Sequence, residues 1–498
     1  MFGGLVKPVF CKFLQLNFEA NETECEGRIS VKMFFKIFAF FTIFYLMLIS
    51  WGLETFPMAD AETVVFTMRM PIDGFTSFFV KEALSKVLFP SLVIFLLVYG
   101  IWIWVIKTVS ARKALLVLLF FCFLGGSIYL YEELPIRDYI NVLNRDFQQP
   151  SHSVCMKNDF FRLSVDSVFR DSSREKRNLV LIIAESMENG FDGYVPELLN
   201  LSKNNMNFSP DGKFGGGIDI VGANSTTSST VSKISGFPLL ASNYSKLFPK
   251  IPTIYDVLRK YGYVNHFIQG TSGKFGFGGE FLVDHGVDYY EDDENLEKKG
   301  IVKYKDRITD KDLFDYAKKI IKQNENEPFS LTIATIETHF PYGFYDEKCR
   351  EKPENPSDEA VLKATLRCSS RQISEFVSFV LNEKIAERTE IVILGDHLFK
   401  GKLVVQDYIG ERSWLSIFIN SSVSSGVSLK RKFTSIDMAP TILESMGFVL
   451  PQHKMAFGTS LFSDSKTLLE KIGLDSLNHE FARLTTSFEY NNLIVQKE

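Results

Sequence analysis

Three long apolar runs near the start of the chain constrain its fold more than any other feature. They cover residues 37–53, 87–106 and 114–131, and none of them contains a charged residue. Each run has about the length that an α-helix needs to cross a bilayer core of roughly 30 Å. We therefore expect three transmembrane helices within a membrane domain of residues 34–132. A cleaved signal peptide is the alternative interpretation of the first run.

The charged residues that flank these runs indicate their orientation. Lys32 and Lys36 precede the first run, and Lys107, Arg112 and Lys113 lie between the second and the third. Because basic residues mark the cytoplasmic side, the N-terminus should be inside and everything after residue 132 outside. In a bacterium, this predicts a multi-pass protein of the inner membrane with a periplasmic C-terminal portion. The net charge of −5 gives no reason to expect a nucleic-acid partner.

The C-terminal portion has the pattern of a large α/β domain. Continuous apolar runs at 178–185, 330–338 and 390–397 are typical of strands buried on both faces of a parallel sheet. Helical stretches such as 251–262 and 312–323 lie between them, and this alternation predicts a doubly wound, mostly parallel sheet. The expected order is an N-terminal segment, the membrane domain, a linker, a catalytic domain and a C-terminal helical tail, at residues 1–33, 34–132, 133–177, 178–463 and 464–498.

Side chains that can bind metal follow the predicted strands. Glu185 ends the first strand, Glu337 and His339 end the second, and Asp396 and His397 end the third. Ligands of open parallel sheets bind outside the carboxyl ends of the strands, so these side chains should converge at one edge. Carboxylates together with imidazole suit a divalent cation such as Mn²⁺, Zn²⁺ or Mg²⁺. His339 could also bind a phosphate oxygen or protonate a leaving group.

The stretch GANSTTSSTV at 222–231 is rich in hydroxyl groups. A hydroxyl bound to a metal ion has a lowered pKa and can act as a nucleophile near neutral pH. The alternatives are a flexible polar loop and a glycosylation acceptor, because Asn224-Ser225-Thr226 fits N-x-T. Composition cannot choose among these hydroxyls.

Several motifs resemble the sulfatase-related, membrane-anchored phosphotransferases, which include lipoteichoic acid synthases and phosphoethanolamine transferases. The motifs are IIAES at 182–186, GANST at 222–226, GFPLL at 236–240 and GDHL at 395–398. The resemblance implies a sheet of the alkaline-phosphatase and sulfatase type. It implies a metal ion, Mn²⁺ favoured over Mg²⁺ or Zn²⁺, held by the set Glu185, Thr226, Asp396 and His397. It implies Thr226 as the nucleophile, with Thr227 as the fallback. The position of His339 at a strand end makes it the candidate that binds substrate.

Further stretches are similar to the branch of this family that transfers phosphoglycerol to periplasmic glucans. SIDMAPTILESMGF at 435–448 resembles the closing element of the family as a whole, whereas the likeness to this branch rests on YGYVNHFIQG at 261–270, FLVDHGVD at 281–288, THFPYGF at 338–344 and RCSSRQISEF at 367–376. This likeness implies phosphatidylglycerol as the donor, a glycan as the acceptor, and a phospho-threonine intermediate. The stretch KFGFGGEF at 274–281 lacks the Trp and Arg of the lipoteichoic acid branch. Phosphatidylethanolamine is the alternative donor.

Two other enzyme classes remain as alternatives. A true sulfatase would need the pentapeptide C/S-x-P-x-R, which the chain does not contain. A phosphatase-like hydrolase has little use for membrane spans, whereas a transferase with a lipid donor does. Cys349 and Cys368 both fall in the portion expected outside the cytoplasm, and they are the best candidates for a disulfide.

Overall fold

The protein is described from a computed structural model that covers residues 31–57, 60–61, 63–65, 77–105, 109–133, 136–144, 167–170, 175–210, 212, 214–240, 251–274, 278–423 and 430–484. The chain divides into two compact units. The first comprises residues 1–54 and 78–134, and the second comprises residues 55–77 and 135–498. The expected N-terminal segment, apart from its last residues, lies outside the described residues.

The first unit is helical. Its elements are α2 (Val31–Thr55), α4 (Ser77–Ala83), η3 (Leu84–Leu88), α5 (Phe89–Gly100), η4 (Ile101–Val105) and α6 (Val109–Glu133). Among the described residues, two stretches are long and apolar enough to cross a membrane, Lys36–Thr55 and Val80–Ile103. The first contains the predicted span 37–53, and the second covers residues 87–103 of the predicted span 87–106. The third predicted span falls within α6, whose apolar stretch Val117–Glu132 is shorter, so this span stays a prediction.

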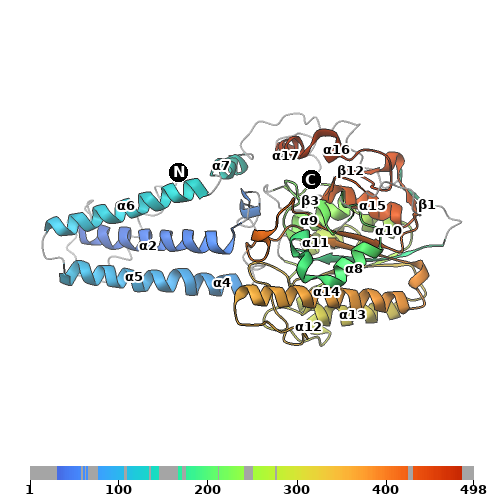
Figure 1. Ribbon diagram of the computed structural model, residues 1–498, viewed down its shortest axis with the longest axis horizontal. Helices are drawn as coiled ribbons and strands as arrows, with labels where there is room; N and C mark the ends of the chain where they lie inside the picture. Colours follow the sequence, from blue (N-terminus) through green and yellow to red (C-terminus); the bar gives the residue numbers. More distant parts are fainter. Residues whose placement is uncertain are drawn as a thin grey trace, which may run out of the picture. The chain divides into compact units, whose positions relative to one another are not determined.

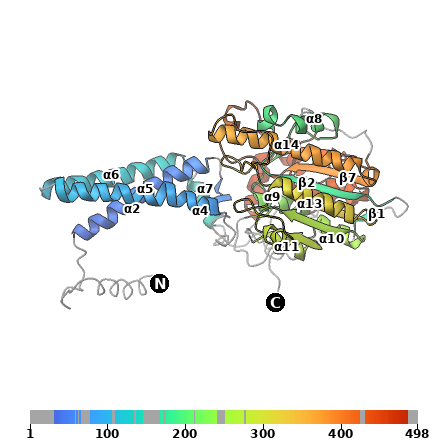
Figure 2. The ribbon, with the colours of Figure 1, turned by 90° about the horizontal axis from the view of Figure 1, so that it is seen from below.

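Helices α2, α5 and α6 run side by side (Figures 1 and 2). The Phe123 ring of α6 lies 4.9 Å from the Tyr45 ring of α2, measured between centroids, and the Tyr45 hydroxyl is 3.1 Å from Ser127 Oγ. Other apolar side chains face outward, and Leu96 and Leu97 are each 63% exposed. An apolar surface of this kind is costly in water and suits lipid.

The second unit is built around a mixed sheet of eight strands in the order β5-β4-β6-β2-β7-β8-β3-β9. Their bounds are β2 Asn178–Ala184, β3 Gly216–Ile218, β4 Val264–Gln269, β5 Tyr289–Glu291, β6 Phe329–Ala334, β7 Thr389–Gly395, β8 Trp414–Ile419 and β9 Phe433–Thr434. Strands β5, β4, β6, β2 and β7 are mutually parallel, and β8 pairs with β7 in the antiparallel sense. The prediction of a mostly parallel sheet is confirmed, and the three predicted strands are the neighbours β6, β2 and β7.

Helices cover both faces of this sheet (Figure 1). Successive side chains of β2 point to opposite faces of the sheet and so enter two different cores. Leu179, Leu181 and Ile183 pack into the first core, and Val180 and Ile182 pack into the second. The first core includes side chains of α9 (Thr226–Ser235), α10 (Ile254–Lys260) and α15 (Met438–Ser445). The second includes side chains of α8 (Pro196–Asn204), α13 (Asp310–Gln323) and α14 (Asp358–Asn382). Burial on both faces is the reason that the strand sequences are continuously apolar.

Smaller elements complete the second unit. They are α7 (Ile136–Asn144), β1 (Phe169–Arg170), η8 (Asn189–Tyr194), α11 (Gly278–Asp284), α12 (Asp293–Lys298), η10 (Ala386–Arg388), η11 (Val405–Asp407), η12 (Ser435–Asp437), β10 (Phe448–Val449), η13 (Pro451–His453), β11 (Lys454–Met455), β12 (Gly458–Thr459), α16 (Leu468–Ile472) and α17 (Leu474–Ala482). The region expected as a linker contains α7 and β1, and β1 pairs with β10. The region expected as a tail contains α16 and α17, where Leu477 and Phe481 are buried in the first core.

A short segment that follows α2 also belongs to the second unit. Within it, Ala61 and Val65 are buried in the same core as α9. Asp60 Oδ2 accepts a hydrogen bond of 2.7 Å from Asn224 Nδ2, and Lys400 Nζ lies 3.3 Å from the same oxygen. We call the described residues between 56 and 65 the juxtamembrane segment.

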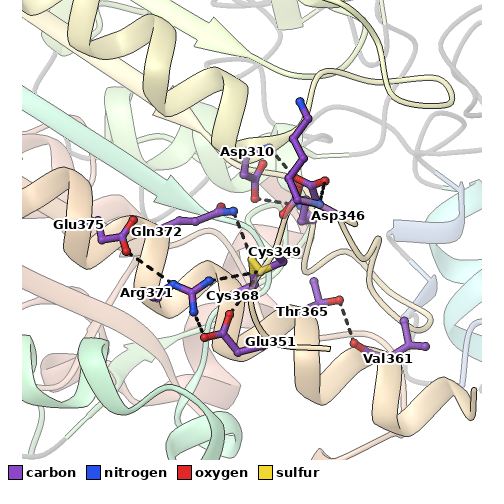
Figure 3. Close-up of a disulfide and its surroundings, with 12 residues drawn as sticks. Asp310, Asp346, Cys349, Glu351, Val361, Thr365, Cys368, Arg371, Gln372 and Glu375 are labelled. Carbon is purple, nitrogen blue, oxygen red and sulfur yellow. Dashed lines mark hydrogen bonds and ion pairs between the residues drawn. A yellow bond between two sulfur atoms is a disulfide. The ribbon is translucent and has the colours of Figure 1, made fainter. Parts of the chain in front are cut away.

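The predicted disulfide between Cys349 and Cys368 is confirmed, and it joins the loop after β6 to α14 (Figure 3). The two Cα atoms are 6.0 Å apart. Arg371 of α14 forms an ion pair with Glu351, two residues after Cys349. Although Glu351 lies beside the two sulfurs, their covalent bond leaves no thiolate there to bind a metal.

Candidate metal and nucleophile site

The edge of the sheet beyond β2 and β7 brings three ionisable side chains together. The two strands are parallel and in register, with Ala184 opposite Gly395, so the residues that follow them emerge at the same level. Glu185, Asp396 and His397 each offer one ligand atom, and these atoms all lie within 4.8 Å of one another. All three residues are buried. The convergence expected from the sequence therefore occurs for these three.

Thr226 completes this group from another element. It is the first residue of α9, which Ser225 caps through a reciprocal bond with Ser228. The Thr226 Oγ1 atom lies 3.3 Å from Glu185 Oε2 and 3.3 Å from His397 Nε2. The position at the start of a helix also places Thr226 where the helix dipole favours an anion.

A glycine turn sets the direction of the chain before Thr226. Gly222 has φ +78, and a Cβ at this position would lie 2.7 Å from Leu240 Cδ2. The Gly222 carbonyl accepts a hydrogen bond of 2.7 Å from the Leu239 amide. The turn allows the GFPLL stretch to pack against GANST. A side chain at position 222 would push these two stretches apart and displace the loop that carries Thr226.

The hydroxyls that follow Thr226 have other partners. Ser225 and Ser228 bond to each other at 2.7 Å, and Ser229 donates to the carbonyl of Asp396. The methyl group of Thr227 is directed toward Gly278. Among the hydroxyls of 222–231, that of Thr226 lies within hydrogen-bonding distance of Glu185 and of His397, and it donates its single proton to one of them at a time. The geometry thus separates Thr226 from its neighbours, which composition could not do.

The electrostatics of the group favour a bound cation. Burial, and then the charge of Asp396, raise the pKa of Glu185 well above its usual range. Asp396 Oδ1 accepts the amides of Ser186 and His397 at 2.6 and 2.7 Å, whereas the buried Oδ2 has no hydrogen-bond partner among the described residues. Two buried carboxylates with an orphaned oxygen are costly unless a positive charge compensates them.

The orientation of His397 agrees with this interpretation. Its Nδ1 lies 2.8 Å from the carbonyl of Leu398, so Nδ1 carries the proton in the neutral ring. Its Nε2 then presents a lone pair toward Asp396 Oδ2 at 3.3 Å and toward Thr226. A hydrogen bond from the remote nitrogen to a carbonyl is the usual arrangement of a histidine that binds metal. The residues present therefore fit a divalent cation.

The side chains of His339 and Glu337 do not join the group formed by Glu185, Asp396 and His397, although the sequence predicted that all five would converge. His339 lies close enough to Asp396 and His397 to interact with their charges, but it is not part of the group within 4.8 Å. Loss of water around the ring lowers its pKa to about 4, so the imidazole is neutral at neutral pH. Its Nδ1 is 2.7 Å from the Phe340 carbonyl. The proton therefore sits on Nδ1, and Nε2 is an acceptor.

Glu337 was wrongly expected to join the metal-binding side chains. Its Oε1 accepts the amide of Asp310 at 3.1 Å, and its own amide donates to Asp310 Oδ2 at 3.2 Å. These reciprocal bonds fix the start of α13 against the loop after β6. Strand position alone cannot distinguish this structural role from a ligand, because residues around a strand end point in several directions.

Three charged residues near the site were not identified from the sequence. Lys233 is fully buried, donates to the Asp396 carbonyl at 2.5 Å, and lies 4.1 Å above the Trp414 ring. Burial lowers its pKa to about 8. Asp219 accepts the amide of Leu398 at 3.2 Å, and Lys400 approaches Asp60. The position of Lys233, seven residues after Thr226 on one helix face, was an available signal.

The sequence of the second unit is similar to that of known proteins. A model of the sulfatase family matches residues 177–448. Phosphoglycerol transferase I of Xanthomonas campestris pv. campestris strain B100 is 25% identical over 319 residues, which cover 58% of this chain and 43% of that protein. Phosphoglycerol transferase I of Escherichia fergusonii is 27% identical over 300 residues, covering 55% and 38%. The chain thus spans about two fifths of the length of these curated relatives.

A solved structure with the same fold is that of the lipoteichoic acid synthase LtaP from Listeria monocytogenes. Its TM-score is 0.50 at 15% identity, covering 67% of this chain and 98% of that one. At this level of identity the likeness shows the fold alone.

Proposed function

The chain belongs to the sulfatase family, and we propose that it is a membrane-anchored, metal-dependent phosphotransferase. Its donor is phosphatidylglycerol, its acceptor is a glycan outside the cytoplasm, and the group that it moves is phosphoglycerol. One observation carries the proposal: the Thr226 hydroxyl lies 3.3 Å from both Glu185 and His397, beside the Asp396 carboxylate. The relatives named phosphoglycerol transferase I support the choice of headgroup.

Glu185, Asp396, His397 and the Thr226 hydroxyl would hold the divalent cation, with Mn²⁺ favoured over Mg²⁺ or Zn²⁺. When bound, the cation would lower the pKa of the Thr226 hydroxyl and neutralise charge on a phosphate. The protein supplies the geometry for this. The Leu398 carbonyl fixes the His397 ring, and the amides of Ser186 and His397 fix Asp396.

The proposed reaction is a double displacement. Thr226 Oγ1 forms a bond to the phosphorus of the donor while the bond from phosphorus to the diacylglycerol oxygen breaks, and diacylglycerol leaves with a proton. A hydroxyl of the glycan then forms a bond to the same phosphorus, and the bond to Thr226 Oγ1 breaks. The start of α9 faces the phosphoryl group throughout and stabilises its negative charge.

His339 is suited to orient a substrate hydroxyl in this scheme. With its proton on Nδ1 and a pKa lowered to about 4, the ring stays neutral and Nε2 is a hydrogen-bond acceptor. It would accept a hydrogen bond from the incoming glycan hydroxyl, whose proton passes to the departing Thr226 oxygen in the second displacement. The sequence suggested instead that it donates to a phosphate oxygen or a leaving group, and the hydrogen bond to Phe340 favours the acceptor role.

The proposed location is the inner membrane of a bacterium, with the second unit on the periplasmic side. The two apolar helices support membrane anchoring. The disulfide between Cys349 and Cys368 supports an oxidising compartment, since such bonds rarely persist in the cytosol. A lipid donor fits this location, because diacylglycerol can stay in the bilayer while its headgroup is transferred.

The test is capture of the covalent intermediate. Full-length protein with Mn²⁺ is mixed with vesicles that contain both phosphatidylglycerol and phosphatidylethanolamine, quenched in acid and analysed by mass spectrometry. We expect a phosphoglycerol adduct on Thr226, no adduct in Thr226→Ala, and an adduct in the matched control Thr227→Ala. A phosphoethanolamine adduct would overturn the headgroup. An adduct that persists in Thr226→Ala would overturn the mechanism, and free phosphoglycerol without any adduct would indicate a hydrolase.

A further inference from the structure

The juxtamembrane segment contacts loops that carry the residues of the candidate site. Asp60 bonds to Asn224, which precedes Thr226 by two positions, and to Lys400, which follows His397 by three. Phe56 packs its ring against Phe340, with 5.7 Å between centroids. Thus one short stretch from outside the sulfatase-like sequence reaches the nucleophile loop, the metal-ligand loop and the loop of His339.

The contacts of Asp60 form a closed network. Its Oδ2 accepts from Asn224 Nδ2 at 2.7 Å, from Thr63 Oγ1 at 3.0 Å and from Lys400 Nζ at 3.3 Å. Thr63 Oγ1 is also 3.3 Å from Asn224 Oδ1, so its single proton is shared between Asp60 and the oxygen of the Asn224 amide. Burial raises the pKa of Asp60, but Lys400 and the bonds from Thr63 outweigh this and lower it overall. Asp60 is therefore an anion at neutral pH.

The network matters because Asn224 lies at the point where the chain enters α9. The next residue, Ser225, is the cap of that helix, and Thr226 is its first residue. A rotation of the Asn224 backbone would swing the Thr226 hydroxyl away from Glu185 and His397. Displacement of a reacting atom by about 1 Å can reduce a rate by roughly a hundredfold.

We propose that Asp60 is a positioning residue for the transfer reaction, acting from the juxtamembrane segment through Asn224 and Lys400. The inference rests on the proposed function and adds to it that the active site is completed by a segment outside the residues that match the sulfatase family. Asp60 touches neither the nucleophile nor the metal ligands. It fixes the loop of Thr226 relative to the loop of His397.

The test compares single and double variants of the full-length protein. The rate of diacylglycerol release and of adduct formation on Thr226 is measured with phosphatidylglycerol vesicles and Mn²⁺. Asp60→Ala should slow adduct formation by about tenfold or more, mainly through kcat, because the loop is misplaced more than the lipid is lost. Asn224→Ala should have a similar effect, and the double variant should be little slower than either single one, because both remove the same contact.

Controls separate positioning from unfolding. Asp138, an exposed acid on α7, is the matched control, and Asp138→Ala should keep the wild-type rate. The shift in melting temperature on addition of Mn²⁺ should be unchanged in Asp60→Ala, since the metal ligands are intact. If wild type forms the adduct and Asp60→Ala forms it equally fast, or if the effects of the single variants simply multiply, the inference is wrong. If wild type itself forms no adduct, the proposed function has failed instead.

Discussion

Removal of the disulfide between Cys349 and Cys368 should destabilise the second unit by an amount that follows from the loop it closes. The two cysteines are separated by 19 positions. In the chain-entropy model, a loop of this length restricts the unfolded chain by about 3 kcal/mol at 25 °C. Both cysteines are buried, so Ala is the best replacement, because Ser would add a buried hydroxyl. We expect the double Ala variant to lose about 3 kcal/mol in free energy of unfolding.

The assay must report on the second unit alone, because a chain with two units does not unfold in one step. Proteolysis at increasing urea concentration meets this need, since cleavage follows the population of the open form. Activity at low urea should change little, because the loop of His339 keeps other bonds, such as that from the Gly343 amide to the His339 carbonyl at 3.0 Å.

Reductant provides the decisive control for this prediction. Wild type treated with reductant should lose stability until it matches the double variant, and the double variant should not respond. Equal midpoints for untreated wild type and the double variant would refute the reasoning about the unfolded state. A response of the double variant to reductant would mean that the reductant acts elsewhere.

Two further predictions concern buried carboxylates. Burial raises the pKa of Glu390 from 4.5 to about 8, so the unfolded chain releases this proton first and stability falls as pH rises from about 4.5 to about 8. The stability of Glu390→Gln relative to wild type should therefore rise by about 3 kcal/mol between pH 4.5 and pH 7, and a constant difference in urea-dependent proteolysis would contradict this. Chelation with EDTA should lower the melting temperature because Glu185 and Asp396 are then buried together without a cation, and Mn²⁺ should restore it. In Glu185→Gln the effect of EDTA should shrink, and a full effect there would place the metal elsewhere.

Local pattern was sufficient to predict much of the fold. A strand buried on both faces must be apolar at every position, so β2, β6 and β7 were visible as continuous runs. Their adjacency follows from parallel pairing, and it brings Glu185 beside Asp396. Strand β8 was not predicted. All six of its residues are buried, and nothing in their pattern indicates that the strand runs antiparallel to its neighbour.

The parts of the site that the sequence did not indicate depend on packing between distant segments. Asp60 and Asn224 are 164 positions apart, and Asp60 and Lys400 are 340 apart. No local period or spacing encodes such pairs. Lys233 is a different case, because its spacing of seven residues from Thr226 puts both on one helix face and was a usable signal. The burial of α9 against the sheet then turns Lys233 inward, toward the Asp396 carbonyl.

The contacts of the juxtamembrane segment also bear on the number of membrane spans. This segment lies between α2 and α4, and it bonds to Asn224, so both must be on the same side of the membrane. The chain between them passes through α5 and then α6. An even number of crossings is therefore required, so if one of these helices spans the bilayer the other must span it as well.

The stretch Val80–Ile103 has the length and apolarity of a span. If that stretch spans the bilayer, the topology that we propose has α6 return across it, although the apolar stretch of α6 is shorter, and has α2 lead to an N-terminus on the opposite side from Thr226. An even number of crossings between the juxtamembrane segment and Asn224 supports the proposed three-span topology. The flanking charges independently favour a cytoplasmic N-terminus.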